Sequence, residues 1–257
     1  CEKLGDKKWA RKVYKKAEGK AEDSGEFCGL AEILSDQLKD KVWAKKVYKK
    51  AEAMDKDNDY LDYLAGSLCE YLDDKVWARK VYKKWEVKAE SSDDFNNLAG
   101  SLCEKLGDKK WARKVYKKAE DMAGGYSDFY NLANSLCDNL DDKVWTKKVL
   151  EKAEDKVVSN IPEDEERGPE TSEDFSSLAD LICINLGDKE WAKKFYEKAE
   201  ETAEYSEEFR HLADGLCESL GNKKWAKMVY KKAEGKARNY VDFDYLADSL
   251  CEKLDDK

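Results

Sequence analysis

The sequence is poor in the residues that most catalytic and metal sites use. It has one histidine, no C-x-x-C, H-x-x-x-H or C-x-x-C-H spacing, and no glycine-rich phosphate loop, so neither a zinc site, covalent haem nor a nucleotide site is predicted. That histidine, His211, follows Arg210 on a predicted exposed helix face, with no Ser or Cys partner at a recognisable spacing. Among 57 acidic residues, a catalytic acid–base pair cannot be distinguished from carboxylates on a solvated surface. We therefore expect neither an enzyme nor a cofactor.

Long apolar runs and prolines are also scarce. The longest apolar run in the second half covers residues 181–184, whereas a bilayer crossing needs about 18 to 20 residues, so no transmembrane segment is predicted. Two prolines beside 8 Trp, 14 Tyr and 7 Phe argue against disorder. The 48 basic and 57 acidic residues leave a net charge of −9, which makes nucleic acid an unlikely partner. A folded, water-exposed protein is the expectation.

Tryptophan marks an internal repeat that fills the chain. Its spacing is 34 residues five times and 46 residues once, which is typical of a helical repeat array. The tryptophans concerned are Trp9, Trp43, Trp77, Trp111, Trp145, Trp191 and Trp225. Seven repeats are predicted over residues 1–257 as a single domain, starting at Asp6, Asp40, Asp74, Asp108, Asp142, Asp188 and Asn222.

Each repeat predicts two amphipathic helices and no strand. In residues 111–119 and again in residues 129–140, the apolar side chains recur three and four positions apart, with charged residues between them. Asp or Gly separates the helices, as in Gly107-Asp108. A helix pair this small cannot bury both faces alone, so stacked neighbours must cover them. The fold class is therefore an all-α solenoid.

The run from Leu106 to Glu120, with Ala112, Tyr116 and Ala119 spaced along its helix, resembles the tetratricopeptide repeat. The Leu-Ala step at Leu98 and Leu132 resembles the close-packing step of that family's first helix. The chain departs from the family pattern by one extra residue in the turn, by an added Trp and by a missing Pro. The resemblance implies a right-handed α-solenoid with a role in binding or assembly and no chemistry of its own.

The 46-residue spacing comes from a 12-residue insertion within residues 157–171, between the two helices of the fifth repeat. It contains Pro162, Pro169 and the acidic run 163–166. Proline stops helices and like charges repel, so an exposed, extended loop is predicted. Its acids lack the spacing of a calcium loop, so no metal site is expected there.

Most cysteines share one repeat position. They are Cys1, Cys69, Cys103, Cys137, Cys183, Cys217 and Cys251, with Ser35 in the first repeat and Cys28 outside the pattern. Stacked helices lie about 8 to 10 Å apart, while a disulfide needs Cα atoms within about 7 Å. We therefore expect free, buried thiols, with an intermolecular bond at Cys28 or Cys1 left open.

One predicted helix face carries a basic stripe. It includes Arg11, Lys12, Lys15, Lys16, Lys45, Lys46, Lys49, Lys50, Arg79, Lys80, Lys83, Lys84, Arg113, Lys114, Lys117 and Lys118. A solvated surface, an acidic face of another chain and a polyanion all remain open as its role. The polyanion is least favoured because the aromatics are expected on the buried face, where they cannot stack on bases.

Two positions after the repeated Phe vary from repeat to repeat. In the tetratricopeptide family, which this chain resembles, the corresponding positions of the first helix line a peptide-binding groove. Genetic drift on an exposed surface explains the variation equally well. The groove candidates are Asp62, Tyr63, Asn96, Asn97, Tyr130, Asn131, Arg210, His211, Asp244 and Tyr245.

Neither end of the chain shows a polar capping repeat, which solenoids normally need. The first and last helices are expected to expose apolar faces that join copies head to tail, and such a contact propagates into a filament. The residues predicted at this interface are Trp9, Val13, Tyr14, Phe243, Leu246, Leu250 and Leu254. An excerpt of a longer array, or a processed Cys1, would explain the ends as well. Self-assembly is the first functional hypothesis, and binding of a peptide or protein in the groove is the alternative.

Overall fold

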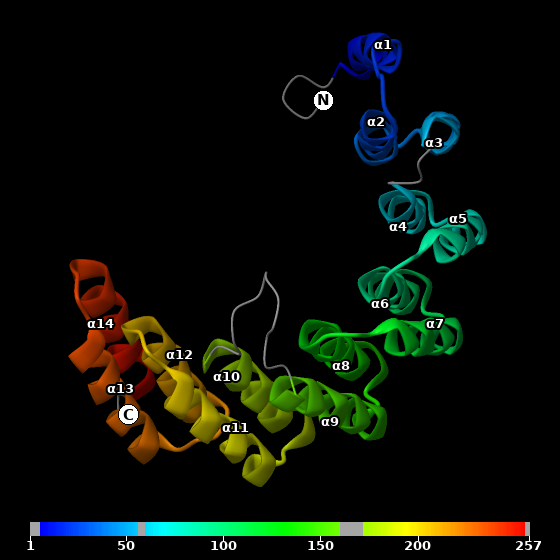
Figure 1. Ribbon diagram of the computed structural model, residues 1–257. Coiled ribbons are helices and arrows are strands. Elements are labelled where there is room, and N and C mark those ends of the chain that lie inside the picture. The colour runs from blue at the N-terminus through cyan, green and yellow to red at the C-terminus, as the bar shows by residue number, and fades with distance from the viewer. Residues whose placement is uncertain (1–5, 56–59, 160–171, 255–257) are drawn as a thin grey trace. The chain divides into compact units, whose positions relative to one another are not determined.

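The computed structural model describes residues 6–55, 60–159 and 172–254. These ranges contain helices and no strand (Figure 1). The elements are α1 (Lys7–Glu18), α2 (Ser24–Asp36), α3 (Lys41–Met54), α4 (Leu61–Leu72), α5 (Lys75–Lys88), α6 (Ser92–Ser101), η1 (Leu102–Leu106), α7 (Lys109–Met122), α8 (Tyr126–Leu140), α9 (Lys143–Ser159), α10 (Ser172–Leu181), η2 (Ile182–Leu186), α11 (Lys189–Thr202), α12 (Ser206–Glu218), α13 (Lys223–Lys236) and α14 (Tyr240–Leu254).

The helices alternate between two kinds, as the repeat predicts. We call the odd-numbered α-helices, which begin next to a Trp, the B helices, and the even-numbered ones the A helices. The expected all-α repeat fold is confirmed. Most of the insertion, residues 160–171, lies outside the described residues, so the prediction about that loop stays a prediction.

Every B helix begins in the same way. The first repeat residue accepts a hydrogen bond from the backbone N–H of the tryptophan three positions on, at 2.9 to 3.1 Å, in each of the seven repeats. Asp is the cap in six of them and Asn222 in the seventh. Such caps satisfy backbone donors that the first helical turn leaves free.

The A helices end on a left-handed residue directly before that cap. It is Gly107, Gly187 or Gly221 in three repeats, with φ of 70°, 68° and 74°, and Lys39, Asp73 or Asp141 in the others. Two A helices finish in a π turn, η1 and η2, instead of an α turn. A π turn takes up one more residue than an α turn.

The core lies between each A helix and the B helix that follows it. In α4 and α5, for example, Leu64, Leu68, Val81 and Tyr82 are completely buried. Small Ala65 lets the two helices approach closely, since its side chain adds little volume. The same positions are buried in the other inner repeats.

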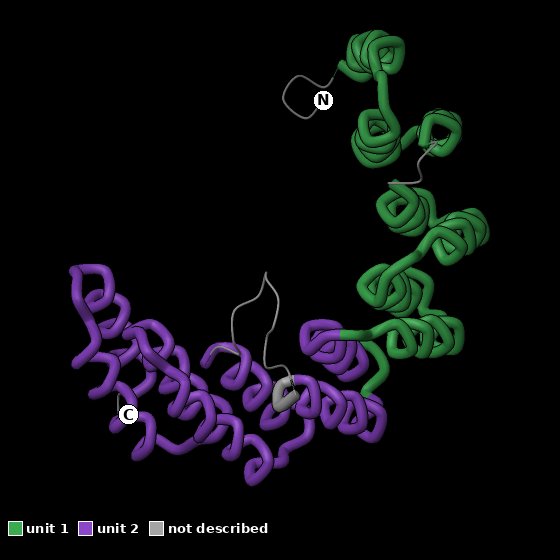
Figure 2. The backbone as a smooth tube through the Cα atoms, in the orientation of Figure 1, with its two compact units in different colours: residues 1–124, 138–141 green, residues 125–137, 142–257 purple. Residues whose placement is uncertain are grey.

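The chain divides into two compact units, coloured in Figure 2. Unit 1 comprises residues 1–124 and 138–141, and unit 2 comprises residues 125–137 and 142–257. Within unit 1 the A helices α2, α4 and α6 contact one another in succession, and within unit 2 so do α10, α12 and α14. The division into seven repeats of one domain stays a prediction.

The cysteines in the described residues are free, as expected, but their burial is uneven. Cys28 and Cys183 are buried, whereas Cys251 is exposed and the others are half-buried. The prediction of a uniformly buried ladder was wrong, because the repeat position lies at the edge of the helix interface and not in its centre. Cys1 lies outside the described residues.

Candidate functional site: the face of the A helices

The predicted groove residues lie on the A helices, and most of them reach solvent. Those that are exposed are Asp62, Tyr63, Asn97, Asn131, His211, Asp244 and Tyr245. Tyr130 and Arg210 are half-buried. Asn96 is buried by the helices packed around α6, unlike Asp62 and Asp244 at the same position, so its expected exposure was wrong.

A second variable position, missed in the sequence, directly follows the Leu-Ala step of each A helix. Its occupants along the chain are Glu32, Gly66, Gly100, Asn134, Asp180, Asp214 and Asp248. We call it the post-Ala position. The signal that could have found it is this change from acid to glycine and back within an otherwise regular repeat.

In unit 2 the post-Ala acid binds a buried tyrosine of the next B helix. The hydroxyl of Tyr196 donates to Asp180, and that of Tyr230 donates to Asp214, each at 2.5 Å. Asp214 also accepts from the hydroxyl of Ser249 at 3.3 Å. The acid therefore ties two A helices and one B helix together.

In unit 1 the glycine at the post-Ala position leaves a hollow of about 250 Å³. Gly66 has no atom within 4 Å of the place where a Cβ would lie. The hydroxyl of Tyr82, at the base of the hollow, is buried without a hydrogen-bond partner. The hydroxyl of Ser101, which faces this gap, donates instead to Asp62 at 3.0 Å.

Acidic groups dominate the walls of the hollow. Glu32, Asp62 and Glu70 line it, and the nearest cation, Lys105, lies 3.7 Å from Glu70. Desolvation raises the pKa of Asp62 despite its hydrogen bond from Ser101. The hydrogen-bonding carboxylate of Glu32, together with burial, raises the pKa of Tyr63 to about 12. The raised pKa values of Tyr63 and Tyr82 keep these tyrosines of the hollow protonated at neutral pH.

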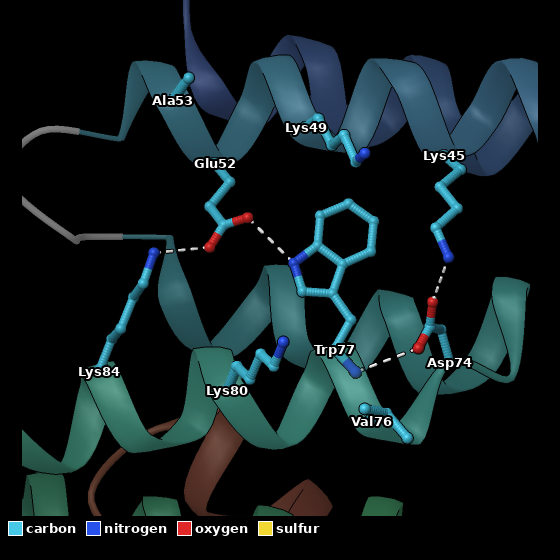
Figure 3. Close-up of a pocket in the computed structure, with 9 residues that line it drawn as sticks. All are labelled: Lys45, Lys49, Glu52, Ala53, Asp74, Val76, Trp77, Lys80 and Lys84. Carbon is cyan, nitrogen blue, oxygen red and sulfur yellow. Dashed lines mark hydrogen bonds and ion pairs between the residues drawn. The ribbon is translucent and has the colours of Figure 1, made fainter.

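A larger groove of about 790 Å³ lies between the B helices α3 and α5 (Figure 3). At its centre, Glu52 accepts from the indole N–H of Trp77 at 2.9 Å and from Lys84 at 2.6 Å. Beside it, Lys45 donates to the cap residue Asp74 at 2.6 Å. The three-residue arrangement of Trp, Glu and Lys, which we call the clasp, joins one B helix to the next.

The clasp recurs, which favours a structural role for this groove. The same pair of bonds converges on Glu18, Glu86 and Glu200. A similar hollow of about 380 Å³ opens in unit 2 beside Lys147 and Lys148. The groove is therefore what stacked B helices leave between them.

Much of the basic stripe is neutralised within the molecule. Arg11, Lys45, Arg79 and Lys147 pair with the cap residue of the following repeat, and others reach the clasp glutamates. The expected burial of aromatics was incomplete, since Tyr63 and Tyr245 are exposed. Both belong to A helices, however, so they do not interleave with the lysines of the B helices.

The residues predicted for head-to-tail assembly differ in exposure. Trp9, Val13, Phe243 and Leu250 are exposed, whereas Tyr14 and Leu254 are half-buried. Leu246 is only 3% exposed, so its predicted exposure was wrong. It occupies the Leu of the Leu-Ala step, which packs inward in every A helix.

Within the described ranges, no helix is long and apolar enough to span a membrane. Nor do three or more His, Cys, Asp or Glu side chains gather there in a way that would hold a metal ion.

The two π-turn repeats also carry the family signal. The model of the tetratricopeptide repeat matches residues 94–125 and 178–205, each of which runs from an A helix through a π turn into a B helix. These two stretches are tetratricopeptide-like repeats. A search of the curated proteins found no match. Tetratricopeptide-like repeats indicate a scaffold for protein interactions, and the A helix followed by its B helix is the repeating pair.

Proposed function

We propose that this tetratricopeptide-like protein is a non-enzymatic scaffold that binds a peptide or protein segment along its A helices. The observation that carries the proposal is the exposed variable position of the A helices, occupied by Tyr63 and Asn97 on α4 and α6 of unit 1 and by His211 and Tyr245 on α12 and α14 of unit 2. Aromatic and amide side chains of this kind provide contact area and hydrogen bonds at protein interfaces. The B helices offer mainly lysines and arginines, and Lys45, Lys50, Arg79 and Lys84 among them pair with neighbouring repeats.

A random-peptide display library selected on residues 1–257 tests this proposal. Binding of the enriched peptides is compared between the variants Tyr63→Ala and Asn97→Ala and the matched controls Lys49→Ala and Lys80→Ala on the B helices. We expect the A-helix variants to weaken binding by about tenfold and the controls to leave it unchanged. Failure to enrich any peptide, or loss of binding only in the lysine variants, would contradict the proposal.

Self-assembly is a second candidate, favoured by one specific contrast. Phe243 is 50% exposed, whereas Phe209 at the same position of α12 is 5% exposed. Phe209 is covered by the following B helix, whose Lys232 lies 5.8 Å from its ring centroid. The B helix α1 carries an exposed Trp9 and Val13. We propose that α1 of a second copy packs on α14 as α13 packs on α12.

Light scattering across a concentration series tests assembly of the chain. The mean mass should rise with concentration, and Phe243→Asp or Leu250→Asp should suppress the rise, because a charge would be buried without a partner. Met228→Asp is the control, since Met228 is an exposed apolar residue on the B helix α13. A mass equal to one chain at every concentration would rule the contact out.

A further inference from the structure

The helices that flank the Gly66 hollow have a counterpart in unit 2. The A helices α2 and α4 repeat the arrangement of α12 and α14 at four positions. Glu32 corresponds to Asp214, Ser67 to Ser249, Asp62 to Asp244 and Tyr63 to Tyr245. The hydrogen bonds correspond as well, since Ser67 donates to Glu32 at 2.6 Å and Ser249 donates to Asp214 at 3.3 Å.

In unit 2 a cation completes this arrangement. Arg210 donates to Asp214 at 3.3 Å, and its guanidinium lies 5.5 Å from the ring centroid of Tyr245. The Arg210 side chain is only 16% exposed. A guanidinium between a carboxylate and an aromatic face gains both a charge-assisted hydrogen bond and a cation–π contact.

In unit 1 the residue at the position of Arg210 is Cys28, a buried thiol that is neutral because burial raises its pKa to about 12. The acid and the aromatic ring are therefore present without their cation. The glycine at the post-Ala position of α4 opens the space next to them, where the buried hydroxyl of Tyr82 has no partner. A buried hydroxyl without a partner is unfavourable, so a ligand that bonds to it there is favoured.

We propose that the hollow formed by Glu32, Asp62, Tyr63, Gly66, Glu70 and Tyr82 binds an arginine side chain of a partner peptide. The guanidinium donates to Glu32 in place of the hydroxyl of Tyr63, and it lies beside the Tyr63 ring as Arg210 lies beside Tyr245. Its remaining N–H groups donate to the oxygen of Tyr82 and to the neighbouring carboxylates. Three acids against the single Lys105 provide the matching charge. This site rests on the proposed peptide-binding function and names the residue that unit 1 selects.

The test uses a fluorescein-labelled peptide, Gly-Ser-Gly-Arg-Gly-Ser-Gly amide, and the same peptide with citrulline in place of arginine. Citrulline keeps the shape of the side chain and loses its charge. We expect the arginine peptide to bind about tenfold more tightly, by fluorescence anisotropy at low salt. Cys28→Arg, which supplies an internal cation, and Glu32→Gln, which removes the facing charge, should each weaken binding of the arginine peptide by at least about fivefold. Glu201→Gln, an exposed acid of α11, should not.

Equal binding of the two peptides, or unchanged binding by Glu32→Gln, would overturn the arginine site. Circular dichroism shows whether Cys28→Arg has folded, and if it has not, Glu32→Gln decides the outcome. Failure here is separable from failure of the proposed function. Library peptides that bind through Tyr63 and Asn97 without a preference for arginine would leave the scaffold function intact and remove only this site.

Discussion

At the scale of single residues, equivalent repeats differ in the hydrogen bonding of one buried tyrosine hydroxyl. Tyr82 and Tyr230 are both buried at the same repeat position. Tyr230 donates to Asp214, whereas Tyr82 faces the space left by Gly66 and has no partner. The same residue type therefore joins helices in one repeat and has an unpaired hydroxyl in the other.

This contrast predicts opposite responses to the same substitution. Tyr230→Phe leaves Asp214 without one of its donors and should lower the free energy of unfolding by about 1 to 2 kcal/mol. Tyr82→Phe removes only an unpaired hydroxyl and should leave stability unchanged or slightly raised. Thermal unfolding followed by circular dichroism measures both. Equal losses in the two variants would mean that Tyr82 has a partner after all.

The cysteines should differ sharply in reactivity, because the thiolate is the reactive form and burial suppresses it. Cys28 is buried, with its pKa raised to about 12, whereas Cys251 is exposed. In a Cys1→Ser background at pH 8, a maleimide should label Cys251 rapidly and Cys28 only after denaturation. Peptide mass spectrometry identifies the labelled residues. Rapid native labelling of Cys28 would contradict its placement in the core.

At the scale of the elements, the clasp at Glu18, Glu52, Glu86 and Glu200 joins a B helix to the next one. Glu200 on α11 accepts from the indole of Trp225 at 2.7 Å and from Lys232 at 2.9 Å, both on α13. The lysine is about half exposed, so its ion pair contributes little. The half-buried indole N–H depends on Glu200 for its bond, which makes this the stronger part of the clasp.

Neighbouring glutamates at the end of α11 provide a matched test. Glu200→Ala leaves the indole N–H of Trp225 without its acceptor and should cost about 1 kcal/mol of stability. Glu201→Ala changes an exposed residue and should stay within about 0.5 kcal/mol of the original protein. Denaturant unfolding at a fixed pH gives both values. If the two losses are the same, the clasp does not hold α11 to α13.

At the scale of the whole molecule, the stability of a repeat array is roughly a sum of similar terms, so small effects at equivalent positions add. The cap residues are such a set. The backbone N–H of Trp43 and the guanidinium of Arg11 lower the pKa of Asp40, and the N–H of Trp111 and Arg79 lower that of Asp108. The pKa of Asp74 is lowered as well, and the largest cause there is the hydrogen bond from Lys45.

These shifts predict a loss of stability in acid. A carboxyl whose pKa is lower in the folded than in the unfolded chain stabilises the fold above its unfolded pKa of about 3.9, and this contribution disappears as the pH falls through its folded pKa. The melting temperature should therefore fall progressively below about pH 4. Asp108→Asn should reduce this dependence while keeping the cap, as Asn222 does. A melting temperature that stays constant down to pH 2 would refute the role of the caps.

The 34-residue period, and the apolar residues spaced three and four positions apart, determined the order of the helices from the sequence alone. Asp and Asn at the repeat starts likewise indicated where each B helix begins, because capping and helical periodicity are local properties. These predictions needed no knowledge of which helices touch. They left open which variable positions are free and which are covered.

Only the tertiary structure decided those positions, since burial depends on neighbours that are distant in the sequence. Asn96 and Leu246 turned out buried because adjacent helices cover them. The Gly66 hollow lies where α4 has no side chain and where the buried hydroxyl of Tyr82, on the next helix, has no partner. A glycine in a helix looks the same in the sequence whether it opens a site or merely fills a tight space, and only the packing of three helices around it shows which.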